Sequence, residues 1–478
     1  MSSSISYIIG ARGPQDEHLS AATYTGSEED IKTLFGHKWS RHTVFAFYDR
    51  IIAPRSGING WRTEQNGTTF EMPREADLIG QVWLMMEIEA VRTSTGAPPA
   101  DGKYASLIDA NGYFTTKVFV DDVARAAMER TRMAIGSHEM EVITGDVLHI
   151  QETLAPSDES YLSIHASAGG SSAIETMNLG AYRDGVYTPT VSVNSGRVKQ
   201  TIYVPLRFSF TKSWETYLRW SKILFNQLTF TAYMKDISAV SILTPFSESG
   251  MRIKDDDATD KVLVTGGRMT LSLMVRFVTL GQQESEYMQS VLEGRLYLAE
   301  QIKVFENEIS SAARQSFPLV THHPTKVVLM YFKNHAFTDP TSVGVLNYWN
   351  WCLTGHGGTA TTSNPQRPEP FERMTVLLGQ HIHYGGNSGM EAPYYTELMP
   401  LEHYGKTTHK LDRVAVVPFA LKPRAWRPTG SVNMTQNDGL TFQVQYPPGT
   451  LPSGKLMIVQ FCQNYYLIKD NALQMEWQ

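Results

Sequence analysis

The sequence predicts an all-β protein built from two consecutive eight-stranded jelly-roll sandwiches, with long surface loops and a short connecting helix. Strand-like segments dominate the 478-residue chain, and its two halves share a spaced pattern. One hydrophobic core stops growing at roughly 250 to 300 residues, so a chain of this length is expected to hold two large domains. All-β units of this size with long, irregular connections are typical of jelly rolls, in which two packed sheets close over one core.

The strand predictions depend on apolar residues that alternate with polar ones or form short runs. Near the C-terminal end, Leu440, Phe442, Val444 and Tyr446 alternate with polar residues, which places the four apolar side chains on one face of a strand. The preceding segment 427–430 reads Arg-Pro-Thr-Gly and fits a tight turn. Further strands are expected at residues 44–54, 78–91, 198–210, 226–234 and 268–280.

An internal echo indicates that the two domains share one strand order. Val204-Pro205-Leu206 is followed by Leu228-Thr229-Phe230, and Val417-Pro418-Phe419 is followed at nearly the same spacing by Leu440-Thr441-Phe442. A long apolar strand then closes each half, at residues 268–280 and 455–468. Two sandwiches with the same order of strands would produce this repetition.

A helix is expected between the two domains. Met288, Leu292, Leu296 and Ala299 recur at intervals close to one helical turn, although Gly294 weakens the pattern. We therefore expect an N-terminal arm, a first jelly roll, the connecting helix and a second jelly roll, with long contact-making loops at 163–197 and 353–370. The expected boundaries are 1–27, 28–281, 282–296 and 297–478.

Composition excludes several classes of protein. Hydrophobic residues make up 42% of the chain and charged residues 19%, which is enough to build cores and excludes global disorder. A net charge of −6 gives no general attraction to polyphosphate, so direct nucleic-acid binding is not expected. The two cysteines, Cys352 and Cys462, lie beside bulky apolar or aromatic residues and are expected to be buried thiols in a protein that folds in the cytosol. No signal peptide is expected, because the apolar run near the N-terminus is too short for one, and no apolar stretch approaches the length needed to span a bilayer.

One segment partly matches a phosphate-binding loop. Residues 449–455 carry the required glycines and Lys455, but Leu456 stands where Ser or Thr must hold magnesium. A phosphate loop must also lead into a helix, whereas an apolar strand follows here, and Pro452 lacks one amide donor. We expect a hairpin loop that binds no nucleotide.

A pair of histidines partly matches a metal site. His381 and His383 would project from one face of a strand, as in cupin barrels, and Glu391 is the nearest following carboxylate. Glu391 lies farther along than the cupin pattern places it, and no second cupin motif follows. His322 and His323 would point apart on their strand. No catalytic, cofactor-binding or metal-binding residue is therefore predicted, and no cofactor.

Several stretches, in order along the chain, resemble the double jelly-roll major capsid proteins of nucleocytoplasmic large DNA viruses such as phycodnaviruses and iridoviruses. "FALKPRAWRPTGSVNMTQNDGLTFQVQY" from 419 is similar to the penultimate strands of that family, and "HHPTKVVLMYFKN" from 322 to an early strand of its second domain. Residues 203–234 and 273–289 are similar to the end of its first domain. Residues 34–50 are similar to its entry helix and first strand.

The resemblance implies a structural protein of the virion, not an enzyme, made in the host cytoplasm. It implies a homotrimer that forms a pseudo-hexagonal capsomer and tiles an icosahedral capsid. Implied partners are neighbouring capsomers, penton and minor capsid proteins, and an inner viral membrane through indirect contact. Two alternatives stay open. One is an assembly scaffold or minor capsid protein of the same fold, as in poxviruses, and the other is a carbohydrate-binding or carbohydrate-cleaving β-sandwich protein.

Overall fold

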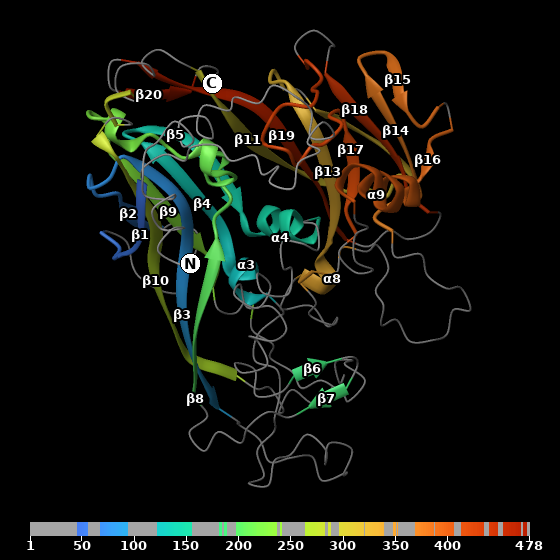
Figure 1. Ribbon diagram of the computed structural model, residues 1–478. Helices are drawn as coiled ribbons and strands as arrows, with labels where there is room; N and C mark the ends of the chain where they lie inside the picture. Colours follow the sequence, from blue (N-terminus) through green and yellow to red (C-terminus); the bar gives the residue numbers. More distant parts are fainter. Residues whose placement is uncertain are drawn as a thin grey trace, which may run out of the picture.

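The computed structural model describes the residues that form two β-sandwiches and the contact between them (Figure 1). The described residues are 45–55, 67–93, 122–154, 181–183, 186–188, 197–236, 240, 263–282, 285–287, 296–319, 321–338, 348–349, 351, 369–386, 388–405, 413–434, 439–447, 453–469 and 472–475. The predicted N-terminal arm, Cys352 and most of the two long loops lie outside these residues.

The first sandwich consists of two four-stranded antiparallel sheets. One sheet has the spatial order β1 (Phe45–Ile52), β10 (Leu263–Leu280), β3 (Leu78–Thr93) and β8 (Arg197–Pro205). The other has the order β2 (Thr68–Glu71), β9 (Leu228–Met234), β4 (Met128–Ile135) and β5 (His138–Thr144). Short β6 (Ala181–Arg183) and β7 (Val186–Thr188) pair with each other.

The second sandwich repeats this order. Its first sheet runs β11 (Leu296–Glu308), β19 (Gly454–Lys469), β13 (Thr325–Asn334) and β17 (Ala415–Pro418), with β20 (Ala472–Met475) added to β19. Its second sheet runs β12 (Arg314–Leu319), β18 (Leu440–Gln445), β14 (Arg373–Leu378) and β15 (His381–Tyr384), with β16 (Met390–Glu391) added to β14. Counting the eight principal strands of each sandwich in chain order, both have sheets ordered 1-8-3-6 and 2-7-4-5, the jelly-roll arrangement.

The predicted internal echo falls on equivalent strands. Val204-Pro205 ends β8 and Val417-Pro418 ends β17, which are both the sixth principal strand of their sandwich. Pro205 pairs with Trp83, and Pro418 pairs with Val327, on the third strand in each case. The predicted repetition of one strand order is thus confirmed at the level of register.

The helices among the described residues are short and occur between strands. In the first sandwich they are α3 (Val123–Ala127), α4 (Gly145–Thr153) and the 3-10 turns η3 (Ser209–Thr211), η4 (Trp214–Thr216) and η5 (Trp220–Lys222). In the second they are α8 (His335–Thr338), the π-helical η7 (Tyr394–Leu398) and α9 (Met399–Tyr404). No helix in the described part of the chain is long and apolar enough to cross a bilayer.

The predicted connecting helix is wrong at its C-terminal end. Residues 282 and 285–287 are helical, but Leu296 and Ala299 belong to β11, which pairs with β19 from Leu296 to Glu308. Thirteen consecutive partners on β19 outweigh a weak helical periodicity, because strand formation is decided by cross-strand packing more than by local preference. Residues 288–295, with Met288 and Leu292, lie outside the described residues.

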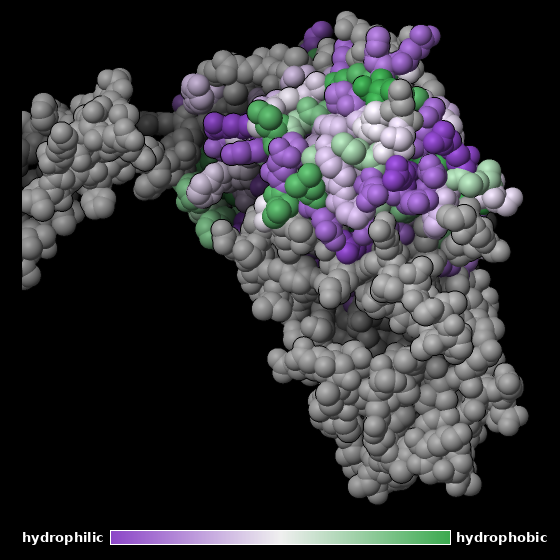
Figure 2. Space-filling view, turned by 90° about the vertical axis from the view of Figure 1, so that its right-hand side faces the viewer, coloured by the Kyte–Doolittle hydropathy of each residue, from purple (hydrophilic) through white to green (hydrophobic). Residues whose placement is uncertain are grey.

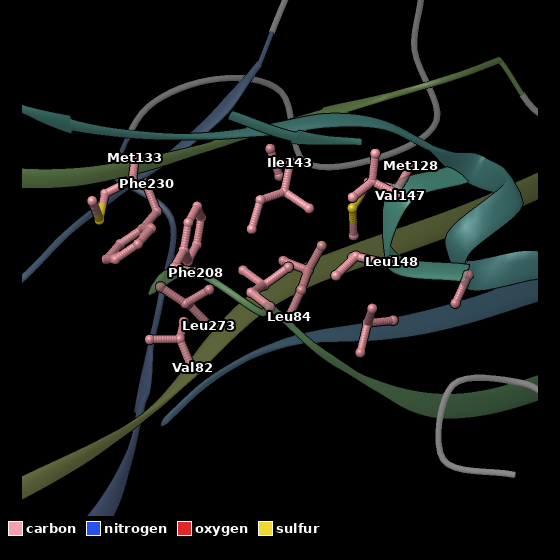
Figure 3. Packing of buried hydrophobic residues seen from close by; sticks show 14 of the residues in the cluster. Val82, Leu84, Met128, Met133, Ile143, Val147, Leu148, Phe208, Phe230 and Leu273 are labelled. Carbon is pink, nitrogen blue, oxygen red and sulfur yellow. The ribbon is translucent and has the colours of Figure 1, made fainter. Parts of the chain in front are cut away.

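Each sandwich encloses its own core. In the first, Val82, Leu84 and Leu273 point inward from one sheet, toward Met133 and Phe230 of the other (Figure 3). In the second, the predicted face of β18 is buried: Leu440, Phe442, Val444 and Tyr446 are each at most 1% exposed. The intervening Gln443 is only half-buried.

This arrangement predicts unequal effects of two adjacent substitutions. Phe442→Ala should lower the free energy of unfolding by roughly 3 to 5 kcal/mol, because it leaves a cavity between β18 and the facing sheet. Gln443→Ala should be close to neutral, since its side chain points away from the core. Urea unfolding of both variants measures the difference; equal, small effects would contradict the register of β18.

Candidate functional site: the joint between the sandwiches

Both faces of the sheet β11-β19-β13-β17 are buried. Along β13, Val328 and Met330 pack in the core of the second sandwich, whereas the alternating Val327 and Leu329 pack in a cluster shared with the first sandwich. Two-sided burial explains why this strand is an almost uninterrupted apolar run. We call the contact between the first sandwich and this outer sheet face the joint.

Helix α4 is the part of the first sandwich that seals the middle of the joint (Figure 1). The side chain of Thr144 caps it by accepting a hydrogen bond from the backbone N–H of Val147 at 3.3 Å. Asp146 lies in the first helical turn, where the helix dipole favours a negative charge. Val147 and Leu148 are buried near Met128, so these two residues of α4 pack against the core of the first sandwich (Figure 3).

The Asp146 carboxylate holds the second sandwich through charged and polar partners. It accepts a hydrogen bond from the Tyr331 hydroxyl on β13 at 2.9 Å and forms an ion pair with Lys333. Burial alone would raise the pKa of Asp146, but Lys333 and Lys235 outweigh it and hold this pKa below its ordinary value. The same pairing keeps Lys333 charged, because Asp146 raises the lysine's pKa despite burial. A buried charge needs such a partner, so the two sandwiches are locked together at this point.

A second acid, Glu141 on β5, lies at another part of the joint. Its carboxylate accepts hydrogen bonds from the backbone N–H of Ser209 at 2.9 Å and from the hydroxyls of Ser209 and Tyr466. Burial raises the pKa of Glu141 to about 7; the Ser209 hydrogen bonds and Lys212 oppose this shift only in part, and Glu300 adds to it. A carboxyl group that is easily protonated therefore links β5 and η3 to β19.

Glu300 on β11 binds two lysines, one from each sandwich. The Nζ of Lys326, in the same sheet, lies 2.8 Å from Glu300 Oε2. Lys212, just after η3 of the first sandwich, forms the second ion pair. Burial alone would raise the pKa of Glu300, but the two ammonium groups lower it to about 2. This acid thus stays ionised at any physiological pH, unlike Glu141.

Aromatic rings from the second sandwich extend the joint. Trp349 stacks on the His149 ring of α4 with centroids 3.7 Å apart, and Trp351 meets the same ring edge-on. Asp122 holds the His149 ring in place through its carboxylate, which lies 2.9 Å from His149 Nδ1. This packing orders residues near β13 against the first sandwich and leaves the imidazole without access to solvent.

The two histidines singled out in the sequence as a partial metal match lie on an edge strand of the second sandwich. His381 and His383 lie on exposed β15, and the His383 ring stacks on Phe419 with centroids 5.4 Å apart. Glu391 is 3.4 Å from Arg373 instead. Within the described residues, no group of three or more His, Cys, Asp or Glu side chains could hold a metal ion.

The lysine of the loop 449–455 lies on a strand. Gly454 and Lys455 begin β19, and Lys455 Nζ is 3.0 Å from a Glu306 carboxylate oxygen and 3.5 Å from one of Glu308. These acids raise the pKa of Lys455, and they would repel a phosphate group. Residues 449–452 lie outside the described part.

A cleft between the sandwiches offers little for carbohydrate cleavage. Its volume is about 160 Å³, and its lining includes the rings of Tyr217, Tyr297 and Trp426. Glu215 is the one carboxylate among the described residues that line it, and it lies 3.3 Å from Arg427. Glycoside hydrolysis ordinarily needs two carboxylates across the bond.

The cysteine Cys462 is buried, as expected, and burial raises its pKa to about 12, which makes it a poor nucleophile.

Sequence reasoning missed Glu141, Asp146 and Glu300. Their partners lie 26 to 325 residues away along the chain, so no local spacing indicates them. One signal was available: the run of residues 325–334 is apolar at both odd and even positions, and lysines interrupt it only near its ends. Such a run indicates a strand that is covered on both faces.

No family model and no curated protein matches this sequence. Solved structures share its fold. The chain of the PBCV-1 virus capsid matches with a TM-score of 0.65 and 17% identity, over 93% of this chain and 100% of that one. The Faustovirus major capsid protein matches with a TM-score of 0.64 and 11% identity, over 92% of this chain and 94% of that one. The Sputnik virophage structure matches with a TM-score of 0.57 and 10% identity, over 94% of this chain and 92% of that one. The predicted double jelly-roll fold is therefore confirmed over both sandwiches.

The Glu141 environment predicts a specific pH dependence. In the unfolded chain this carboxyl ionises near its ordinary pKa of 4.5, but in the folded protein only near 7, so its contribution to stability is lost as pH rises between these values. Glu141→Gln retains an acceptor for the Ser209 N–H and a donor for the two hydroxyls, and it does not titrate. The free energy of unfolding of the variant relative to wild type should therefore increase from pH 4.5 to 7, as measured by chemical unfolding at several pH values.

Asp146 and Glu300 provide the internal control for this measurement. Their lowered pKa values give stability that is present above the ordinary carboxyl pKa and lost as pH falls below it, outside the window of Glu141. Parallel pH profiles for wild type and Glu141→Gln between pH 4.5 and 7 would contradict the assignment.

For the loop 449–455, Lys455→Ala should leave stability and assembly nearly unchanged. The ammonium group is paired at the surface, where an ion pair contributes at most about 1 kcal/mol. Melting of both proteins with and without ATP and magnesium tests the hairpin interpretation. Nucleotide-dependent stabilisation of the wild type that the substitution abolishes would overturn it.

Proposed function

We propose that this chain is the major capsid protein of a large DNA virus, and that its homotrimer forms a pseudo-hexagonal capsomer that tiles an icosahedral shell. The observation that carries the proposal is the match to solved capsid chains over both sandwiches. A fold of this kind supports function by its shape and its surfaces, so the interpretation does not require a reactive side chain.

The joint fits this role. A shell subunit must keep its two sandwiches in one orientation, because a movable hinge between them would misplace its contacts with neighbouring subunits in the lattice. Asp146, Glu141 and Glu300 place charged or strongly polar contacts at separate points of the joint, and each contacts a residue of the other sandwich. Buried pairs of this kind favour one geometry over others, since any displacement leaves a charge unpaired.

We propose further that residues 28–281 and 297–478 are the two jelly rolls, with 1–27 as an N-terminal arm. Neighbouring capsomers, penton and minor capsid proteins are the proposed partners, and an inner membrane the indirect one. The chain would be made in the host cytoplasm, reside in the virion and have no enzymatic activity.

An assembly scaffold of the same fold is the second candidate, because fold alone does not separate it from a shell protein. Electron microscopy of concentrated protein distinguishes them: closed particles favour the capsid protein, and open lattices that never close favour the scaffold. The carbohydrate-active alternative has weaker support, because Glu215 is the one carboxylate among the described residues of the cleft. Turnover of a glycan panel by the purified chain would revive it.

The trimer is directly testable. Two similar sandwiches in one chain can close a ring around a threefold axis by repeating one heterologous contact, and an obligate interface of this kind should bury more than about 2,000 Å² in total. Light scattering on purified protein should give a stable species near three times 53.6 kDa. A monodisperse monomer at high concentration would remove the main support for the capsomer.

A further inference from the structure

The intrachain joint provides a template for a contact between copies, because the two sandwiches have equivalent registers. In the second sandwich, Ile302, Phe461, Val327 and Pro418 form one row of cross-strand partners, and it contributes to the joint. In the first sandwich the equivalent row is Ile51, Met274, Trp83 and Pro205. Each row crosses four strands and ends at the proline of the sequence echo.

The equivalent face of the first sandwich is uncovered. Ile51 is 58% exposed, and Phe47, four residues before it on β1, is 59% exposed. Trp83, Met85 and Met274 are partly exposed on the same side. Together these residues make an apolar sheet face that, in the second sandwich, is the one buried by α4 and η3. We call it the open face.

The second sandwich carries the counterpart of α4 and η3. Helix α4 lies between the fifth and sixth principal strands of the first sandwich; η7 and α9 lie between the same strands of the second. Leu398 and Leu401 on these helices are 50% and 53% exposed, and Leu421 is 76% exposed. His403 Nδ1 lies 3.0 Å from the Leu421 carbonyl oxygen, which places the segment with Leu421 against α9. We call these three exposed leucines the leucine surface.

Position in the molecule agrees with a head-to-tail contact. The open face belongs to the sheet at the left of Figure 1, and α9 lies at the right, so the two surfaces of one chain lie far apart in the molecule. Figure 2 views the right-hand side and shows hydrophobic residues in small patches among hydrophilic ones. A single chain cannot bring the two surfaces together.

Charge gives a second, independent correspondence. Glu300 on β11 pairs with a lysine of its own sheet and receives Lys212 from the other sandwich. By register, Asp49 on β1 is the equivalent of Glu300: it lies two residues before Ile51, as Glu300 lies two before Ile302. Asp49 pairs with Arg276 of its own sheet at 2.8 Å and keeps 35% of its side chain exposed. Lys422, next to Leu421, is exposed and supplies the second cation.

We infer that the open face binds the leucine surface of a second copy of this chain, with Asp49 receiving the Lys422 ammonium group. The inference rests on the proposed function in one respect, because the contact it describes is the one that would close the trimer. It adds which residues make the contact and that the contact is heterologous, so that each copy uses the open face toward one neighbour and the leucine surface toward the other.

Two exposed positions allow the test without loss of folding. Ile51→Lys breaks the open face on an edge strand, where lysine is well tolerated, and Leu401→Lys breaks the leucine surface. Each should weaken self-association by a factor of about 30 or more, as expected for central apolar contacts. Phe225→Lys is the matched control: Phe225 is 75% exposed and belongs to neither surface. Circular dichroism melting verifies that all three variants fold.

Mixing the two broken chains tests the head-to-tail geometry. An Ile51→Lys chain retains an intact leucine surface and a Leu401→Lys chain retains an intact open face, so the mixture should form a 1:1 dimer near twice 53.6 kDa and no trimer. Each variant alone should be monomeric in sedimentation velocity runs at the same concentration. A mixture that stays monomeric, with both chains folded, would contradict a heterologous contact.

The charge pair has its own test. Lys422→Glu should weaken assembly, and Lys422→Arg should preserve it, because only the first reverses the charge that faces Asp49. The failures are distinguishable: a monomeric wild type overturns the proposed trimer itself, whereas a trimer that survives Ile51→Lys and Leu401→Lys overturns only the surfaces assigned here. Equal behaviour of the two Lys422 variants would remove the charge correspondence.

Discussion

The burial of both faces of the sheet β11-β19-β13-β17 is the constraint on which the rest of the molecule depends. One face closes the second sandwich and the other closes the joint, so alternate residues of each strand serve two different cores. A strand in the middle of such a sheet cannot slip by one residue, because that would exchange the two sets of side chains. The sheet therefore fixes the register of the second sandwich and its orientation to the first at the same time.

Polar groups buried in the joint add specificity to this apolar contact. Apolar packing alone tolerates small displacements, whereas Asp146 and Glu300 must meet their lysines or remain as unpaired buried charges. Glu141 differs from both, since its raised pKa allows it to be neutral near pH 7 and to hold Ser209 and Tyr466 by hydrogen bonds alone. The joint thus combines permanent ion pairs with one titratable contact.

Local patterns in the sequence correctly predicted the features that depend on residues close together in the chain. The alternation from Leu440 to Tyr446 fixed the buried face of β18, and the Val-Pro echo marked equivalent strands, because both follow from strand geometry. Leu296 and Ala299 were assigned to a helix because their true partners on β19 lie more than 160 residues away, beyond any local pattern. The acids of the joint were missed for the same reason. The apolar run along β13 was the one local sign of a covered outer face.

The open face of the first sandwich and the equivalent face of the second sandwich, which is buried in the joint, differ in composition. The difference follows from the stage at which each face is covered. Beside Val327, the permanently buried face continues with Leu329, Val416 and Val459; at the equivalent positions the open face has Met85, Tyr203 and Ser272. A face that is buried as the chain folds can be wholly apolar, but a face that waits in water for a second copy must avoid indiscriminate aggregation. Serine, tyrosine and the Asp49–Arg276 ion pair keep the open face soluble, while Ile51, Trp83 and Met274 retain enough apolar area to pack once a partner arrives.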